Sequence, residues 1–338
     1  MLFFNRMTNS WALAAIFLGL FLYGLPSCTT HSQQVESNQD AYLLYYFEGN
    51  AGEKAGLYAA YSYNLHDWHL LKQKICAPQL GEFGVFRDPC IIRDKMGEFH
   101  MVWTCGSSGF GYAHSADGID WQGEKFITVS DSTRGFDFAN VWAPEFYVEQ
   151  DTTYIIWSST LREDYTPPKE AGKWWNSTWN HSLYYTKTVD FKHFSPPASY
   201  WNPDFQVIDG SLYKTDSLYY LFFKDERKGH KNLMMAQSEN MMGPFTDTLS
   251  LAAQYTEGPM YVKTDTALVL YYDYYPGYFG YRYATTKNMK DWNKDFVPLK
   301  HGFQDIMRHG TLVKVSGQEL VKLRQKIGSP GSGLITNF

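Results

Sequence analysis

Charged residues are scarce in this chain of 338 residues: Asp, Glu, Lys and Arg make up 19 % of it, and the formal net charge is −5. No basic stripe is present, and this argues against nucleic acid as a partner. Four cysteines occur, without a CxxC pair and without a cluster of His and Cys at the spacing of zinc ligands. The sequence therefore argues against a structural zinc site.

The chain also lacks an apolar run long enough for a comfortable transmembrane helix. Trp11 to Leu25 is a 15-residue apolar run that follows Arg6 and ends in Leu-Pro-Ser-Cys at Cys28. This pattern resembles a bacterial lipoprotein signal, with ordinary secretion and an uncleaved anchor as alternatives. We expect residues 1–28 to be a lipoprotein signal peptide with its lipobox and residues 29–40 to be a polar tether. The protein would then be exported and anchored to the membrane through lipidated Cys28, at the outer membrane or the periplasmic face.

Helical periodicity is nearly absent, and only residues 317–325 could form one short helix. Aromatic residues, in contrast, make up 18 % of the chain. Continuous apolar stretches of strand length recur at 42–47, 153–159, 218–223 and 267–275. The composition therefore predicts an all-β protein.

Five short apolar runs each open on an acid or a histidine, at intervals of 57, 64, 48 and 52 residues. A period of about 50 residues is typical of the blades of a β-propeller. If each run is the innermost strand of a blade, its first residue lies at the mouth of the central channel. The runs are RDPCIIRD at Asp88, APEFYVEQ at Glu145, IDGSLYKT at Asp209, EGPMYVKT at Glu257 and RHGTLVKV at His309.

A second repeat has the same count and order. Each copy is a polar turn followed by an aromatic residue, a pattern expected between the third and fourth strands of a blade. The copies end at Trp68, Trp121, Phe194, Phe245 and Trp292. The second blade carries an insertion at 161–181. After His309 one strand remains, whereas 42–71 has strands without a leading acid. We therefore expect a five-bladed β-propeller over residues 41–338, with one blade shared between the N- and C-terminal segments.

Three cysteines remain if Cys28 is processed. Cys90 and Cys105 fall in the same predicted blade, where they either form a disulfide or serve as small buried hydrophobic residues.

Converging carboxylates suggest hydrolysis of a glycosidic bond, in which one acid protonates the leaving oxygen while another activates water. Inversion needs carboxyls about 6.5–9.5 Å apart and retention about 5–5.5 Å, so non-adjacent blades favour inversion. Asp88 with Glu257, Glu145 with Glu257, and Asp88 with Asp209 all satisfy this condition. We also expect the charge of Asp209, one blade away, to raise the pKa of Glu257.

The motifs FRDP, WAPE, VIDG, EGP and RHGT resemble those of glycoside hydrolase family 43 over nearly all of residues 41–327. The resemblance implies a five-bladed propeller that hydrolyses arabinosides and xylosides with inversion. It gives Asp88 the role of general base, Glu257 that of general acid, and Asp209 that of the acid that tunes the pKa and orients the second carboxyl. His309 resembles a channel histidine that helps to hold an ion or water network. The resemblance implies no required cofactor, but a structural Ca²⁺ held through water at His309 is compatible with it.

The resemblance places Glu145 in contact with substrate. We expect further contacts from Trp142, from the planar fork of Arg87, and from Phe86 as floor or wall of the −1 subsite. His309 and its neighbour Arg308 complete the predicted substrate-binding set. The insertion adds Trp174, Trp175 and Trp179 as residues that either stack on sugar or pack the insertion onto its blade.

Two departures from the family pattern concern the motifs themselves. The third-blade motif often reads IDP or IDA, whereas here Gly210 follows Asp209. FRDP also occurs in the invertase-like family 32, a retaining family with an NDPNG motif and an EC motif. This chain has no NDPNG, and Gly258 and Pro259 follow Glu257, so we rank family 43 first.

The expected function is an exo-acting inverting enzyme that removes terminal α-L-arabinofuranosyl residues from plant cell-wall polysaccharides or oligosaccharides. A β-xylosidase of the same family and a family 32-like retaining glycosidase are alternatives. A non-catalytic sugar-binding propeller is disfavoured because Asp88, Asp209 and Glu257 are all present.

Overall fold

The computed structural model describes residues 39–48, 54–77, 79–80, 84–170, 177–275, 280–293 and 308–327. The predicted signal peptide with Cys28, most of the predicted tether, and Trp174 and Trp175 lie outside this range. Within it, no helix is long and apolar enough to cross a membrane.

Strands of the described residues form five four-stranded antiparallel sheets, which we call blades 1 to 5. Blade 1 contains β4 (Arg87–Arg93), β5 (Phe99–Thr104), β6 (Gly109–Ser115) and β7 (Gln122–Thr128). Blade 2 contains β8 (Trp142–Glu149), β9 (Thr152–Ser159), β10 (Ser182–Thr188) and β11 (Ala198–Trp201). Blade 3 contains β12 (Val207–Lys214), β13 (Tyr219–Asp225), β14 (Asn232–Ser238) and β15 (Thr246–Gln254).

Blade 4 contains β16 (Thr256–Lys263), β17 (Leu268–Tyr274), β18 (Gly280–Thr286) and β19 (Trp292–Asn293). Blade 5 contains β20 (Arg308–Val315), β1 (Ala41–Phe47), β2 (Leu57–Ser62) and β3 (His69–Cys76). The helical elements of the described residues include two 3₁₀ turns, η3 (Ser132–Arg134) and η4 (Arg162–Asp164), and the α-helix α2 (Gly317–Lys326).

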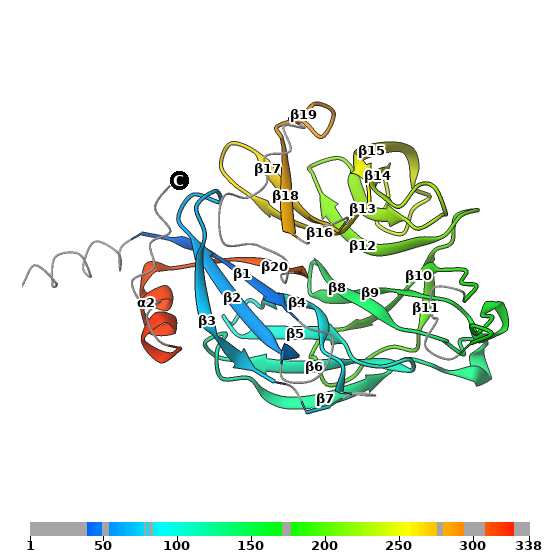
Figure 1. The fold of residues 1–338 in the computed structure, drawn as a ribbon, viewed down its shortest axis with the longest axis horizontal. Coiled ribbons are helices and arrows are strands. Elements are labelled where there is room, and N and C mark those ends of the chain that lie inside the picture. Colours follow the sequence, from blue (N-terminus) through cyan, green and yellow to red (C-terminus); the bar gives the residue numbers. More distant parts are fainter. Residues whose placement is uncertain are drawn as a thin grey trace, which may run out of the picture.

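The blades form a closed ring. Figure 1 shows β4, β8, β12, β16 and β20 around the centre, with the fourth strand of each blade at the outside. Five clusters of buried apolar side chains fill the five interfaces between neighbouring blades. Because alternate side chains of a strand point to opposite faces, each strand serves two interfaces, which explains its continuous apolar sequence. In β1, Tyr45 packs toward blade 1 and Tyr46 toward blade 4. The predicted five-bladed propeller is confirmed.

The fifth blade joins the two ends of the described chain. β20 pairs antiparallel with β1, with Ala41 opposite Val315 and Leu43 opposite Val313. This confirms the prediction of a shared blade. The predicted short helix also exists: α2 follows directly and begins with a capping box between Ser316 and Glu319.

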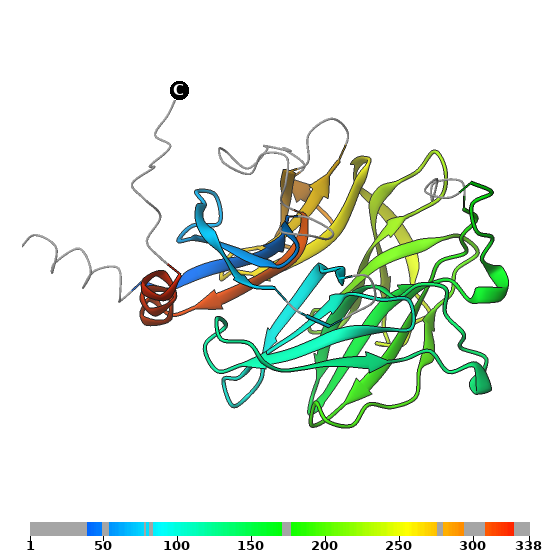
Figure 2. The ribbon, with the colours of Figure 1, turned by 60° about the horizontal axis from the view of Figure 1, so that its bottom comes forward.

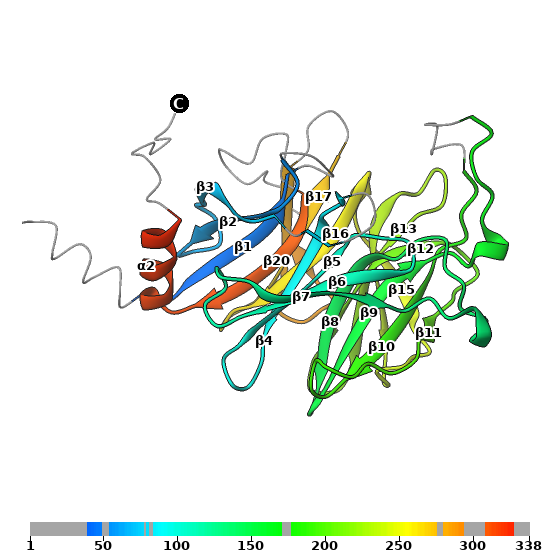
Figure 3. The same ribbon diagram turned by 90° about the horizontal axis from the view of Figure 1, so that it is seen from below.

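Helix α2 covers the junction between blades 5 and 1, at one edge of the ring in Figures 2 and 3. Its buried residues Leu320 and Leu323 belong to the core between these blades. Lys326 pairs with Asp117 at 3.2 Å. The helix therefore fastens blade 5 to the neighbouring blade.

The turn repeat has a common hydrogen-bonding pattern. In blade 1, the Ser115 hydroxyl accepts from the Gly118 amide at 3.0 Å, and Asp117 accepts from the Ile119 and Asp120 amides at 2.9 Å. A hydroxyl residue followed two positions later by Asp or Asn can satisfy the amides of a tight turn in this way. The same pattern recurs from Ser62, Thr188 and Thr286.

Cys76, Cys90 and Cys105 are thiols that take part in no disulfide. Cys90 is buried, and its sulfur accepts a hydrogen bond from the Phe146 amide of blade 2 at 3.3 Å. The packing role foreseen for Cys90 is therefore the one the structure shows, and no disulfide links it to Cys105.

Candidate active site

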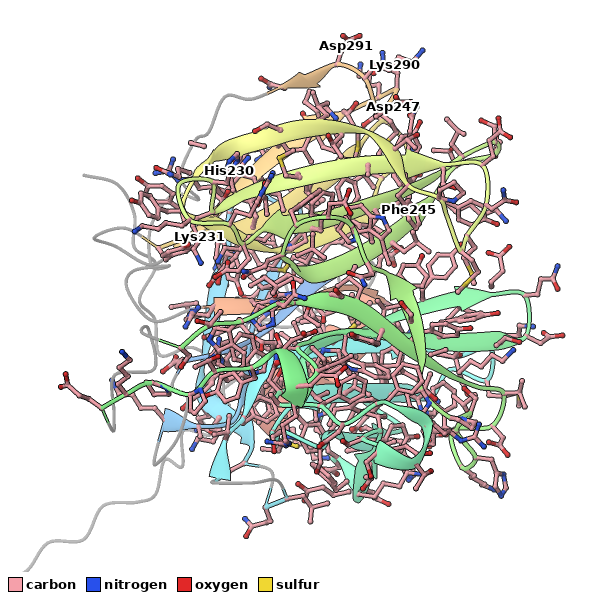
Figure 4. All side chains as sticks on the ribbon, turned by 90° about the vertical axis from the view of Figure 1, so that its right-hand side faces the viewer. His230, Lys231, Phe245, Asp247, Lys290 and Asp291 are labelled. Atoms are coloured by element: carbon pink, nitrogen blue, oxygen red, sulfur yellow. The ribbon has the colours of Figure 1, made fainter. Side chains whose placement is uncertain are left out.

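The predicted site residues lie at one end of the ring, because all innermost strands start there. Antiparallel order brings the connections β5–β6, β9–β10 and β13–β14 to the same end. Figure 4 shows this separation in blade 3, where His230 and Lys231 of the β13–β14 connection lie on the opposite side from Phe245 and Asp247. The predicted insertion in blade 2 is confirmed as the long connection between β9 and β10, and it lies at the site end.

Every innermost strand begins with a one-residue β-bulge, where three steps along it match two steps along its partner. Bulges twist a strand and redirect side chains, which suits the rim of a functional site. In blades 1 to 4 the second bulge residue has a positive φ: 50° at Asp88, 46° at Ala143, 57° at Asp209 and 63° at Gly258. The bulges span 87–90, 142–145, 208–211, 257–260 and 308–311.

The five leading residues of the sequence repeat are therefore not structurally equivalent. Asp88, Asp209 and His309 hold the second position of their bulges, Glu257 holds the first, and Glu145 the fourth. The sequence repeat aligned them as if they shared one position, and the register corrects this. Their side chains nevertheless meet, because the bulge turns different positions toward the ring axis.

Gly210 explains one departure from the family pattern. A Cβ atom at this residue would lie 2.5 Å from Cδ1 of Leu183 on β10 of blade 2. The larger residues common at this place would therefore collide with the neighbouring blade.

In four of the five bulges, a side chain of the preceding blade accepts a hydrogen bond from the amide of the second bulge residue. The Ala143 amide donates to Thr104 Oγ1 at 2.7 Å, and the Asp209 amide donates to Ser158 Oγ at 3.0 Å. The His309 amide likewise donates to Asp273 Oδ2 at 2.9 Å. These links fix the backbone of the site across blade boundaries. The accepting residues Thr104, Ser158 and Asp273 share one register position, opposite Arg87, Trp142 and Glu257 respectively.

His309 lies between two carboxylates. Its Nδ1 is 3.7 Å from Asp88 Oδ1, and its Nε2 is 3.2 Å from Glu145 Oε1. Burial lowers the pKa of His309, but Glu145, Asp209 and Asp88 outweigh it and raise the value to about 10. The ring is therefore an imidazolium that draws together residues of blades 5, 1 and 2. The second oxygen of Asp88 accepts a hydrogen bond from Thr104 Oγ1 at 2.9 Å.

His309 is not suited to ligate a calcium ion directly, whereas a Ca²⁺ held through water at this residue stays a prediction. A protonated imidazole has no lone pair to offer a metal, and Ca²⁺ takes about six to eight oxygen ligands. Among the described residues, the donor atoms of Asp94, Glu98 and His100 do lie within 4.8 Å of one another. That group belongs to the β4–β5 hairpin at the opposite end of the ring, and its His100 already pairs with Asp94 at 3.4 Å.

Glu257 is held by two cations. Lys224 Nζ donates to its Oε2 at 2.6 Å, and Arg308 Nη2 donates to its Oε1 at 2.5 Å. Burial alone would raise the pKa of Glu257, but Lys224 and Arg308 hold it well below its usual range. The expectation of a raised pKa for Glu257 is therefore wrong, because direct contact with two cations outweighs the neighbouring charge of Asp209. Lys224 was absent from the predicted set.

Two other buried carboxyls shift the opposite way. Burial raises the pKa of Asp209 to about 6, with His309 opposing the shift and Glu257 adding to it. Burial also raises the pKa of Asp273 to about 7, with Arg308 opposing the shift. Asp209 and Asp273, rather than Glu257, are therefore the carboxyls that hold a proton at mildly acidic pH. Asp209 Oδ2 also accepts from the Gly258 amide at 3.0 Å, which fixes the backbone beside Glu257.

Arg87 and Phe86 differ in their access to the site. Arg87 leaves 31 % of its side chain exposed, with its Nε 3.9 Å from Asp88 Oδ2. Phe86 is only 1 % exposed and packs on Trp103 in the core between blades 5 and 1. The prediction of Phe86 as a subsite wall is corrected: its ring is buried in the core and presents no face to a sugar.

Trp142 belongs to an aromatic group at the site end of blade 2. Its ring lies 5.1 Å from Trp179 and 4.9 Å from His181, and Trp179 lies 4.4 Å from Tyr165. Trp142 and Trp179 are half-buried and keep part of their surface exposed. The insertion therefore brings a second tryptophan against the predicted subsite residue.

Comparison with known proteins agrees with this arrangement. A family model described as a probable glycosyl hydrolase domain, related to glycoside hydrolase family 43, matches residues 37–320. The chain is similar to a thermostable family-43 glycoside hydrolase, with 13 % identity over 64 % of this chain and 72 % of that chain and a TM-score of 0.50. No curated protein matches the sequence significantly.

Two further solved structures are similar at lower scores. An α-L-arabinofuranosidase from Lactobacillus brevis shares 16 % identity over 62 % of this chain and 72 % of its own, with a TM-score of 0.49. The native arabinanase of Bacillus subtilis shares 14 % identity over 69 % and 82 %, with a TM-score of 0.46. From the family match, together with the propeller fold, the chain belongs to the probable glycosyl hydrolase domains related to family 43 and is a glycoside hydrolase.

Proposed function

We propose that the protein is an exo-acting, inverting α-L-arabinofuranosidase in which Asp88 is the general base and Glu257 the general acid. One observation carries this proposal: consecutive residues of blade 5 separate the two carboxyls. His309 contacts Asp88 of blade 1, while Arg308 contacts Glu257 of blade 4. Carboxyls on either side of an intervening blade leave room for the water that inversion requires.

In the proposed reaction, Asp88 takes a proton from the attacking water. Thr104 donates a hydrogen bond to one oxygen of this carboxylate, and His309 lies 3.7 Å from the other, so both oxygens are held in place. Glu257 gives a proton to the leaving glycosidic oxygen, so it must first take up a proton against the effect of its two cations. Asp209 orients Glu257 by holding the Gly258 amide.

The substrate contacts in this proposal are Glu145, Arg87, Arg308, His309 and the Trp142–Trp179 group. The aromatic group on one side of the site favours a terminal sugar unit over a long chain that passes through. The substrate class is plant cell-wall oligosaccharide or polysaccharide with terminal arabinose or xylose. The reaction uses protein groups and water, and no step needs a cofactor.

The experiment measures hydrolysis of nitrophenyl α-L-arabinofuranoside and nitrophenyl β-D-xyloside by the wild type, Asp88→Asn and Glu257→Gln. We expect wild-type activity on the arabinoside and a loss of about 10³-fold or more in the Asp88 variant, since the base acts directly on the reacting water. Faster cleavage of the xyloside would make the protein a β-xylosidase. Failure to cleave either compound, or any arabinan, arabinogalactan or xylan oligosaccharide, would refute the proposal.

Proton NMR of the first-formed anomer tests the stereochemistry, and a product of retained configuration would contradict the assigned roles.

The cellular location of the protein is the subject of a second proposal. We propose export and membrane anchoring through lipidated Cys28, on the sequence pattern alone. Metabolic labelling with a fatty acid should mark the wild type and leave Cys28→Ala unlabelled. Equal labelling of both would show that Cys28 is not the attachment site.

A further inference from the structure

Lys224 stands on β13 at the register position where blades 1, 2 and 4 hold a hydrogen-bond acceptor. It lies opposite Ile208, as Thr104 lies opposite Arg87 in blade 1. Thr104 receives the bulge amide of the next blade, but an ammonium group has no lone pair and cannot do so. The corresponding bulge amide of blade 4, Gly258 N, donates to Asp209 of blade 3 instead. Lys224 therefore does not make the interblade link that its counterparts make.

The ammonium group of Lys224 is directed at the site. The residue is 3 % exposed, and its Nζ lies 2.6 Å from Glu257 Oε2 and 2.8 Å from Glu226 Oε2. It also lies 4.8 Å from the centroid of the Tyr275 ring. A buried ammonium is costly unless it is paired, and these two carboxylates supply the pairing. Lys224 thus connects a carboxylate outside the proposed reaction, Glu226, to the proposed acid.

Other charged groups lie close to Lys224 and its partner Glu257. Arg308 is the second direct partner of Glu257, and Lys231 is a second partner of Glu226. Burial would lower the pKa of Lys224, but Glu257 and Glu226 raise it, so the ammonium stays charged. Further titratable or charged groups that interact with Lys224 or Glu257 are Arg87, His181, Asp209, Asp273 and Tyr275.

We propose that Lys224 is a positioning residue for Glu257: it fixes one oxygen of the carboxylate and keeps the group charged until substrate is bound. This inference rests on the proposed role of Glu257 as general acid. Glu226 completes the arrangement, since it can keep Lys224 paired when Glu257 takes up a proton from solvent. Protonation of Glu257 then does not leave Lys224 as a buried cation without a charged partner.

A direct test is a ¹³C NMR titration of the glutamate carboxyls, with Glu257→Gln used to assign the Glu257 signal. Lys224→Met should raise the midpoint of Glu257 by about one to three pH units, the effect expected when an opposite charge in contact is removed. The matched control is Lys214→Met. Lys214 pairs with Glu149 at 2.6 Å and lies 4.9 Å from the Tyr219 ring, at the opposite end of the same blade.

The outcomes of the titration are distinct. An unchanged Glu257 midpoint in Lys224→Met would overturn the proposal, as would an equal shift in Lys214→Met. If Lys224→Met does not fold, the double variant Lys224→Met with Glu226→Gln removes both the cation and the carboxylate left behind. That variant should show the same upward shift of Glu257, and its absence would again overturn the proposal.

Kinetics separate this inference from the proposed function. The basic limb of the pH profile of kcat/KM reports the loss of the proton from Glu257. It should move to higher pH in Lys224→Met and return toward the wild-type position in Lys224→Arg. In Glu226→Gln it should move to lower pH, because Lys224 then has only Glu257 as a partner. If Glu257→Gln keeps the wild-type rate and basic limb, the acid assignment fails, while the NMR titration still decides whether Lys224 controls the charge of Glu257.

Discussion

Glu257 and Asp273 face each other across one step of the β16–β17 ladder, yet their pKa values shift in opposite directions. Glu257 meets two cations directly, whereas Asp273 meets the His309 amide and lies 3.9 Å from Arg308 Nε. Burial therefore dominates at Asp273 and ion pairing dominates at Glu257. Adjacent positions in one sheet thus supply one charged and one protonated carboxyl.

Asp273 should make the stability of the fold depend on pH. Its pKa of about 7 in the folded state exceeds the ordinary aspartate value of 3.8, so the folded state binds the extra proton and loses stability as pH rises from about 4 to about 7. Asp273→Asn mimics the protonated form and should flatten this part of the profile. Urea unfolding at several pH values measures the effect, with Asp216→Asn on the exposed β12–β13 turn as control. A variant that keeps the wild-type slope would contradict the assignment.

Gly258→Ala should damage the site through its backbone. The residue has a φ of 63°, and an added Cβ would lie 2.8 Å from Cγ of the His309 ring. We expect a loss of at least tenfold in kcat/KM, because the imidazole must move away from its two carboxylates.

Gly97→Ala is the matched control for this change. Gly97 has a φ of 89° and no atom within 4 Å of an added Cβ, at the opposite end of blade 1. It should lose about 1–2 kcal/mol of stability from the left-handed conformation and keep its activity. Equal activity losses in both variants would show that the contact with His309 is unimportant.

Trp142→Ala should weaken substrate binding more than turnover. Aromatic contacts contribute about 0.5–1.5 kcal/mol each, so KM should rise roughly three- to tenfold with little change in kcat. Trp179→Ala should have a smaller effect of the same kind if Trp179 mainly supports Trp142. Steady-state kinetics on an arabinofuranoside measure both. Trp292→Ala, at the outer edge of blade 4, serves as control and should leave KM unchanged.

Leu320→Ala tests the fastening of the ring by α2. Leu320 is 1 % exposed in the core between blades 5 and 1, and a truncation of this kind costs roughly 2–5 kcal/mol. The urea midpoint should fall accordingly. Lys322→Ala on the exposed face of the same helix should leave the midpoint nearly unchanged. Similar midpoints for the two variants would mean that α2 does not stabilise the junction.

The sequence predicted the architecture well because its repeats reflect local chemistry. A turn such as Ser115 to Trp121 satisfies its own amides, so the same residue types recur in blade after blade. Strand 267–275 was also recognised, since buried strands are continuously apolar. Asp88, Asp209 and Glu257 stood out because they open such strands.

The residues that the sequence analysis missed depend on contacts between blades. Lys224 follows the apolar run 218–223, and Asp273 interrupts the run 267–275, so a charge inside a buried strand was the available signal. Their roles follow from partners far away in the sequence: Glu257 for Lys224 and His309 for Asp273. Phe86 departs from its predicted role for the same reason, since a residue next to Asp88 in sequence can still point into the core.

The pairing of β1 with β20 has a consequence for synthesis. During translation, the strands of blade 5 that follow Ala41 leave the ribosome long before Arg308 and His309 exist. Until then the outer three strands lack their inner partner, and Asp88 and Glu145 lack the imidazolium that joins them. Under the proposed mechanism, hydrolysis requires β20 to be made and paired with β1, so measured hydrolysis reports a chain whose ring is correctly closed.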